Sequence, residues 1–243
     1  MRRIKIAGSI VLLIILVMPF NFYLKRLDEE KARTVAVTVD EIIEVGVTNS
    51  IVTLDKVKKL QEYYDNTDIK AIISIEGNDS FSYPVVQSED NDYYLKHDYY
   101  KQYNTYGSIY ADYRSNLDNG RKVLIFGHSS SKRDVPFNSL ENYYDEDYYK
   151  EHRYITLETE NKMIRYEIFS VYVETKDFTY MNMNFDNEEW YLHIKALQNK
   201  SLYKTDISLN KDDDILIIQT CSKKAEYQKY SKKYLLIVSR RDR

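Results

Sequence analysis

The stretch DILIIQTCSKK, residues 214–224, contains the only cysteine of this 243-residue chain. Four apolar β-forming residues lead into Gln219, Thr220 and Cys221, which predicts a buried strand that ends at the thiol. Two lysines follow directly, so the strand opens onto a polar loop. A lone free cysteine at such a place is either a small buried side chain or a reactive thiol. The residues around it decide between the two.

The chain from about residue 67 onward alternates short β-forming runs with turns, which predicts a mainly β domain. Seven or eight strands in about 175 residues are enough for a barrel or a sandwich. The predicted strands lie in IKAIISIEGNDSFSYPVVQ (69–87, two strands around a turn at 77–79), GSIYADYR (107–114), RKVLIFGH (121–128), YITLETENKMIRYEIFSVYVETK (154–176, a hairpin), DDILIIQTC (213–221) and YLLIVSR (234–240). Two helices interrupt them, a short one in DEDYYKEH (145–152) and a longer one in FDNEEWYLHIKALQNKS (185–201). In the longer helix, Trp190, Ile194 and Leu197 share one face.

The N-terminus predicts a membrane anchor over residues 1–24. Three cations stand in the first five residues, and an apolar run from Ile6 extends to Leu24. As a helix, these 19 residues would span about 28 Å, close to the thickness of a bilayer core. A cleaved signal peptide is the alternative, but no small-residue cleavage site follows the run. We expect a single-pass anchor with a cytoplasmic N-terminus and the main domain, residues 67–243, outside the cell.

Residues 25–66, between the anchor and the β domain, predict a helical stalk. The segment TLDKVKKLQEYYDNT (53–67) places Leu54, Val57, Leu60 and Tyr64 on one face of a helix. We therefore expect the stalk to pack on the β domain.

Composition excludes several classes of function. The net charge of −3 does not favour nucleic-acid binding, which usually needs a basic field. The sequence contains neither paired cysteines nor an HExxH motif, the usual signs of a metal site, and it has no glycine-rich phosphate motif. We therefore expect no metal and no cofactor. The 25 tyrosines fit a β-rich fold, although an AT-rich genome would produce the same count.

His128 is the histidine best placed for chemistry. It ends a buried-looking strand after Gly127 and precedes a polar loop, a position at which loops build sites. The histidines at 97, 152 and 193 are expected at the surface or in packing. Since a thiolate is the nucleophile in cysteine catalysis, an imidazole or a nearby cation would activate Cys221. Five lysines follow Cys221 within twelve residues. They either raise the positive potential around the thiol or simply form a solvated basic loop.

The pattern resembles a known family, the sortases, which are membrane-anchored cysteine transpeptidases of Gram-positive bacteria. A strand ending Gly-His and a later strand ending Thr-Cys carry the resemblance. The middle of the chain is similar to class B in particular, through the segments SYPVVQSEDNDYYLKHDYY (82–100), GSIYADYR, VLIFGHSSS (123–131) and PFNSLENYYDEDYY (136–149), and through the helix between the sixth and seventh strands. The resemblance covers about residues 68–240 and implies an eight-stranded β-barrel with flanking helices.

The resemblance also implies a reaction and its partners. Cys221 would attack the Thr carbonyl of a sorting motif near the C-terminus of a secreted protein and form a thioacyl intermediate. An amine on a cell-wall peptide would resolve it, with His128 as general acid and base. Thr220, Gln219 and Arg133 are expected to contact the substrate.

Two positions depart from the family pattern. Gln219 stands where class B enzymes have Ser, and the catalytic Arg that opens the final strand is missing from KYSKKYLLIVSRR (229–241). Lys233 is the predicted replacement, with Lys232 or Tyr234 also at the matching place. Arg240 would lie about 20 Å from the strand's start. Weak or specialised activity is therefore expected, unless Arg133 substitutes.

Two other functions remain open, and the missing arginine supports the first of them. One is a degraded sortase that binds sorting peptides without turnover, and the other is a hydrolase that cuts the motif without transferring it.

Overall fold

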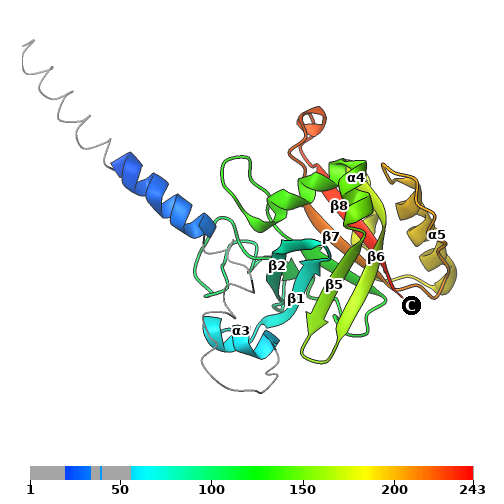
Figure 1. Ribbon diagram of the computed structural model, residues 1–243, viewed down its shortest axis with the longest axis horizontal. Helices are drawn as coiled ribbons and strands as arrows, with labels where there is room; N and C mark the ends of the chain where they lie inside the picture. The colour runs from blue at the N-terminus through cyan, green and yellow to red at the C-terminus, as the bar shows by residue number, and fades with distance from the viewer. Residues whose placement is uncertain (1–19, 34–38, 40–55, 243) are drawn as a thin grey trace, which may run out of the picture.

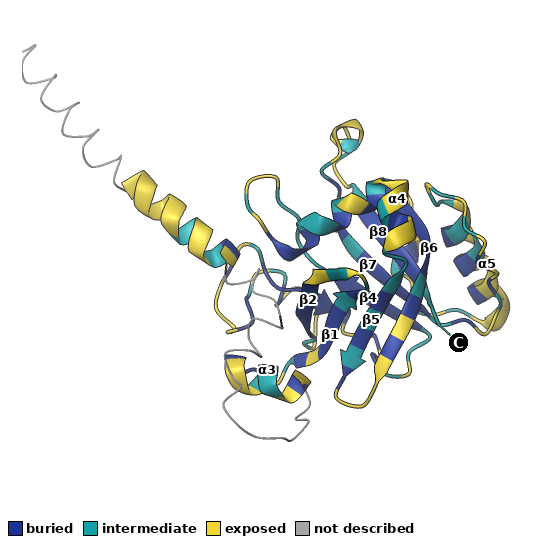
Figure 2. Cartoon of the chain, viewed as in Figure 1, coloured by how far each residue is buried: buried dark blue, intermediate teal, exposed yellow. Residues whose placement is uncertain are grey.

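The computed structural model describes residues 20–33, 39 and 56–242. Residues 20–33 form a helix that extends away from the main body and is mostly exposed (Figures 1 and 2). Within these ranges, no helix combines the length and the apolar character needed to cross a bilayer. Most of the predicted anchor, 1–24, lies outside the described residues, as does the middle of the predicted stalk, residues 34–38 and 40–55.

Eight strands form the main body, as the resemblance implied. In chain order the elements are α3 (Lys56–Tyr64), β1 (Ile69–Ile75), β2 (Asn78–Val86), β3 (Tyr110–Ala111), β4 (Lys122–Phe126), η1 (Pro136–Tyr144), α4 (Glu146–Glu151), β5 (Tyr154–Thr159), β6 (Met163–Glu174), η2 (Thr179–Met181), α5 (Asn187–Asn199), β7 (Ile215–Cys221), η3 (Ala225–Tyr227) and β8 (Tyr234–Arg241). The strands close into a barrel in the order β1-β2-β3-β4-β7-β8-β6-β5. Two neighbouring pairs are parallel, β2 with β3 and β4 with β7, and the others are antiparallel.

The strand at GSIYADYR is shorter than predicted. Only Tyr110 and Ala111 pair in β3. Gly107, at φ +56, turns the chain before the strand, and Asp112 accepts the backbone N–H of Arg114 after it. The turn chemistry at both ends therefore overrides the β propensity between them.

Side-chain alternation divides the core into two layers. One apolar cluster takes residues from all eight strands, including Ile73, Val123, Leu216 and Ile237, and fills the barrel. The opposite faces of every strand except β5 join α3 and α5 in a second cluster outside it. Figure 2 shows β4 and β7 buried almost throughout, whereas β5 and the first half of β6 alternate between buried and partly or fully exposed residues. Because both faces are covered, β7 reads as a continuous apolar run rather than an alternating one.

The helices confirm the predicted faces. Val57, Leu60 and Tyr64 of α3 are buried, so the described end of the stalk packs on the barrel. In α5, Asp186 and Glu189 form a reciprocal capping box at the N-terminus.

The sequence did not indicate η1. It begins at a proline and buries Phe137, Leu140 and Tyr143.

Candidate active site

The parallel pair β4 and β7 brings His128 and Cys221 to the same end of the barrel. Their register ends with Phe126 opposite Gln219, and His128 and Cys221 each stand two residues further on. Neighbouring strands lie about 4.8 Å apart, and Ser129, directly after the histidine, donates a hydrogen bond to the Cys221 carbonyl. The loop after β7 projects from this end of the molecule (Figure 1, orange). The two predicted residues are therefore together.

Cys221 is a free, exposed cysteine at the last position of β7. Although the residue is accessible, protein atoms around the sulfur raise the pKa of the thiol through desolvation, and the Lys233 ammonium opposes that rise. The protonated thiol is thus favoured at neutral pH, and thiolate formation depends on nearby cations and on a base.

His128 is held by a backbone carbonyl. Its Nε2 lies 2.9 Å from the Leu95 oxygen, and because a carbonyl only accepts, Nε2 carries a proton. In the neutral ring Nδ1 is then the free acceptor. Gly107 makes this arrangement possible, since a Cβ there would meet the Leu95 oxygen at 2.6 Å in addition to straining a φ of +56.

Gly127 sets the position of the histidine from the other side. A Cβ on it would meet the Phe137 ring at 2.5 Å, so only glycine lets η1 pack against the end of β4. This is the physical reason for Gly before His in FGH.

Thr220 and Gln219 both hydrogen-bond to protein groups, Thr220 from a buried position and Gln219 from a half-buried one. The Thr220 side chain is 1% exposed, and its hydroxyl donates to the Gly127 carbonyl at 2.9 Å, which ties the ends of β4 and β7 together. The amide oxygen of Gln219 accepts from the Tyr180 hydroxyl at 2.7 Å. Residues flanking the cysteine therefore hold the strand end in place.

The register of β7 and β8 identifies what stands at the place of the missing arginine. Cys221 is opposite Tyr234, and the Ser222 N–H donates to the Lys233 carbonyl at 2.9 Å. The Lys233 Nζ donates to the Tyr230 carbonyl at 3.2 Å. Tyr234, not Lys233, is thus directly across from the thiol.

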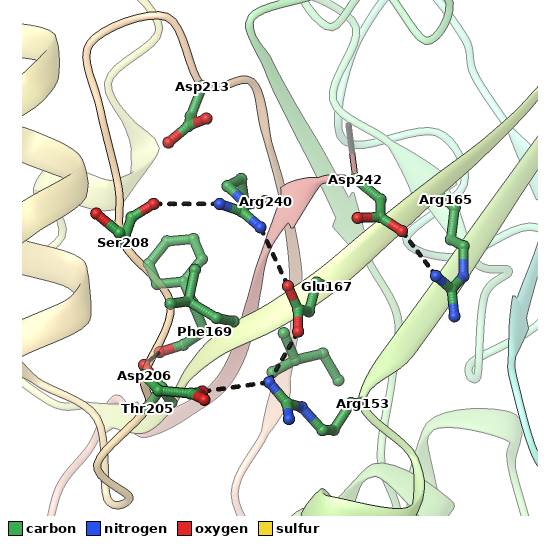
Figure 3. A network of polar contacts seen from close by, with 12 residues as sticks. Arg153, Arg165, Glu167, Phe169, Thr205, Asp206, Ser208, Asp213, Arg240 and Asp242 are labelled. Atoms are coloured by element: carbon green, nitrogen blue, oxygen red, sulfur yellow. Dashed lines mark hydrogen bonds and ion pairs between the residues drawn. The ribbon is translucent and has the colours of Figure 1, made fainter.

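Neither of the two arginines considered from the sequence contacts the cysteine. Arg240 pairs with Ile215 at the other end of β7, as predicted, and bonds to Glu167 and to the Ser208 carbonyl (Figure 3). Arg133 lies in the loop after His128 but forms an ion pair with Asp28 of the N-terminal helix at 2.8 Å.

The other histidines have packing roles. His97 and His152 stack on Tyr93 and Tyr148, with ring centroids 4.1 and 4.0 Å apart. His193 is 8% exposed and lies 2.9 Å from the Lys122 ammonium, where burial lowers its pKa to about 3. Its neutral ring fits the packing role expected for α5.

The Lys233 charge leads to a prediction about pH. In Lys233→Gln, the pKa of Cys221 should rise further, because desolvation then acts without the opposing charge. Alkylation by iodoacetamide needs the thiolate, so its rise with pH should move to higher pH in the variant. Lys229→Gln is the matched control, since Lys229 lies over the Tyr230 ring in the same loop. Equal profiles for Lys233→Gln and the wild type would contradict the assignment.

Comparisons with known proteins agree with this geometry. A family model for the sortase domain matches residues 73–240. Sortase B of Listeria monocytogenes is 30% identical over 179 residues, which cover 72% of this chain and 70% of that protein. The structure of Clostridium perfringens sortase B is similar with a TM-score of 0.67 and 32% identity, over 76% of this chain and 99% of that one. Sortase B from B. anthracis gives 0.72 and 28%, over 88% and 98%.

The family match spans the barrel and includes both strand ends that carry His128 and Cys221. The chain belongs to the sortase family and is a cysteine transpeptidase of the class B type.

Proposed function

We propose that Cys221 is the nucleophile and His128 the general acid and base of a transpeptidation on sorting peptides. The parallel register of β4 and β7, which brings these two strand ends side by side, is the observation that supports it most. A thiol alone is a poor nucleophile at neutral pH, and the imidazole supplies the base that it lacks.

The steps follow from the protonation states. The Cys221 proton passes to Nδ1 of His128, and the thiolate adds to the carbonyl carbon of a Thr residue in the peptide. The carbon–nitrogen bond then breaks, the imidazolium gives its proton to the leaving amine, and a thioester remains. An incoming amine attacks the thioester, loses a proton to His128 and releases the Cys221 sulfur.

The substrates proposed are secreted proteins with a C-terminal sorting signal, and the proposed acceptor is an amine of a cell-wall peptide. Support comes from the class B relatives and from the apolar run at residues 1–24, which would hold the enzyme at the outer side of the membrane with its N-terminus in the cytoplasm. Residues 25–66 would act as the stalk and 67–243 as the catalytic domain.

The roles of the remaining predicted residues differ in kind. Lys233 favours the thiolate through its charge. Gln219 would touch the peptide from the strand end, whereas buried Thr220 would support the site indirectly. Arg133, near His128 in sequence, would contact the substrate only after leaving Asp28.

A direct test uses the full-length chain and synthetic peptides that carry one internal Thr among randomised positions. Intact-mass analysis should detect an acyl adduct, and peptide mapping should locate it on Cys221. Added triglycine, as the amine, should discharge the adduct into a ligated product. An adduct that never forms would favour a binding protein without turnover, and cleavage unaffected by triglycine would favour a hydrolase. Either result would overturn the proposal.

A further inference from the structure

The residue opposite the cysteine is a tyrosine. Tyr234 opens β8 and pairs with Cys221 across the antiparallel ladder. Directly opposite residues in such a ladder project their side chains to the same face, close enough to interact. The phenol is longer than the cysteine side chain, so its hydroxyl can extend past the sulfur toward a group bound there.

The Tyr234 ring is held in place, while its hydroxyl has no hydrogen-bond partner within the described part of the chain. Phe178 packs edge-on against it, with ring centroids 5.9 Å apart, and the residue is half-buried. Among the residues that the structure describes, nothing makes a hydrogen bond with the Tyr234 hydroxyl. By contrast, the neighbouring Tyr180 gives its hydroxyl to Gln219.

The other candidate donors are less well placed. Lys233 precedes β8, and although its charge reaches the Cys221 thiol, its ammonium is engaged with the Tyr230 carbonyl. Arg133 is paired with Asp28, and Arg240 with Glu167 at the far end of the strand.

We propose that Tyr234 is a catalytic residue whose hydroxyl donates a hydrogen bond to the oxyanion formed when Cys221 adds to the peptide carbonyl. This inference rests on the proposed function. The negative charge develops on the carbonyl oxygen as the sulfur–carbon bond forms, and a preorganised donor at that position stabilises the transition state more than the bound peptide. Tyr234 thus takes the electrophilic role with one neutral donor in place of a charged fork.

The phenol stays protonated while it acts. Burial and the neighbouring Cys221 both raise the pKa of Tyr234, so the hydroxyl remains a donor when the thiolate is present. The division of labour follows: Lys233 acts on the charge of the thiol, and Tyr234 acts on the oxygen of the substrate.

Tyr234→Phe in the full-length chain tests the proposal, because it removes the hydroxyl and keeps the ring against Phe178. The rate of adduct formation with the Thr-containing peptides, measured in single turnover, should fall about a hundredfold to a thousandfold. The pH profile of iodoacetamide alkylation should stay within about 0.3 pH units of the wild-type profile. This margin allows for the small effect of the Tyr234 hydroxyl on the thiolate. Tyr234→Arg, which supplies charged donors from the same position, should form the adduct at least as fast as the wild type.

Tyr110→Phe is the matched control, since Tyr110 also lies near enough to Cys221 for their charges to interact but stands on β3. Its adduct should form at the wild-type rate. If Tyr234→Phe forms the adduct at the wild-type rate, the inference about Tyr234 is overturned. The proposed function would still be supported, because the adduct forms on Cys221. An equal loss in Tyr110→Phe would also overturn the inference. A wild-type chain that forms no adduct would instead overturn the proposed function.

Discussion

Replacing His128 with glutamine should lower amine-dependent turnover of the Thr-containing peptides about a thousandfold, within the range for general acid–base catalysis. Glutamine can still donate to the Leu95 carbonyl as Nε2 does, but it neither accepts the thiol proton nor protonates the leaving amine. Both halves of the reaction should slow, so the adduct should neither form nor discharge at the wild-type rate. Steady-state ligation to triglycine and single-turnover adduct formation measure the two effects.

His97→Gln is the matched control for that experiment. His97 is also half-buried, and its Nδ1 lies 2.7 Å from the Tyr93 carbonyl, so the substitution removes an imidazole of similar exposure and bonding. Its turnover should stay within about twofold of the wild type. A His128→Gln enzyme that keeps more than a tenth of its turnover, or a His97→Gln enzyme that loses as much, would contradict the role of His128.

Local sequence patterns were sufficient to predict the strands and the positions of His128 and Cys221 at strand ends. Apolar runs that end in Gly-His and Thr-Cys marked where buried strands open onto loops, and both ends carry the expected side chains. The capped helix between β6 and β7 was equally readable, because Asp186 supplies an N-cap signal and the apolar residues recur at helical spacing.

Long-range pairing could not be read in the same way. The local sequence of a strand does not indicate its neighbours, so it could not predict that β4 lies beside β7 or that β8 separates β7 from β6. The choice between Lys233 and Tyr234 as the residue opposite Cys221 also depends on long-range pairing. Three adjacent residues fit the start of the last strand, and a shift of one residue exchanges the faces of the whole strand, so only the observed register selects Tyr234.

The ion pair between Arg133 and Asp28 is likewise a long-range contact that the local sequence could not predict. The loop position suggested proximity to the substrate, but the guanidinium pairs with Asp28, and the Tyr106 hydroxyl donates to the same carboxylate at 3.0 Å. An ion pair between a loop and a helix so distant in sequence has no local signature. The charge of Arg133 is therefore directed to the N-terminal helix.

Replacing Trp190 with alanine should lower the free energy of unfolding by about 3–5 kcal/mol, the range for removing a large aromatic side chain from a core. Trp190 is 1% exposed on the inner face of α5, and Arg121 covers its ring at 4.8 Å. The substitution also removes the hydrogen bond from Nε1 to the Asp213 carbonyl at 3.0 Å, just before β7 begins. Urea unfolding followed by circular dichroism measures the loss.

Leu192→Ala separates this burial from a general effect on the helix, because Leu192 lies two residues further along α5 and is 62% exposed. Its free energy of unfolding should stay within about 0.5 kcal/mol of the wild type. Similar losses in both variants would mean that α5 is stabilised by its own helix propensity rather than by docking. A loss below about 1 kcal/mol in Trp190→Ala would mean that the outer apolar layer contributes little. A large loss confined to Trp190→Ala would show that α5 stabilises the barrel through the face that the sequence predicted, next to the start of the strand that ends at Cys221.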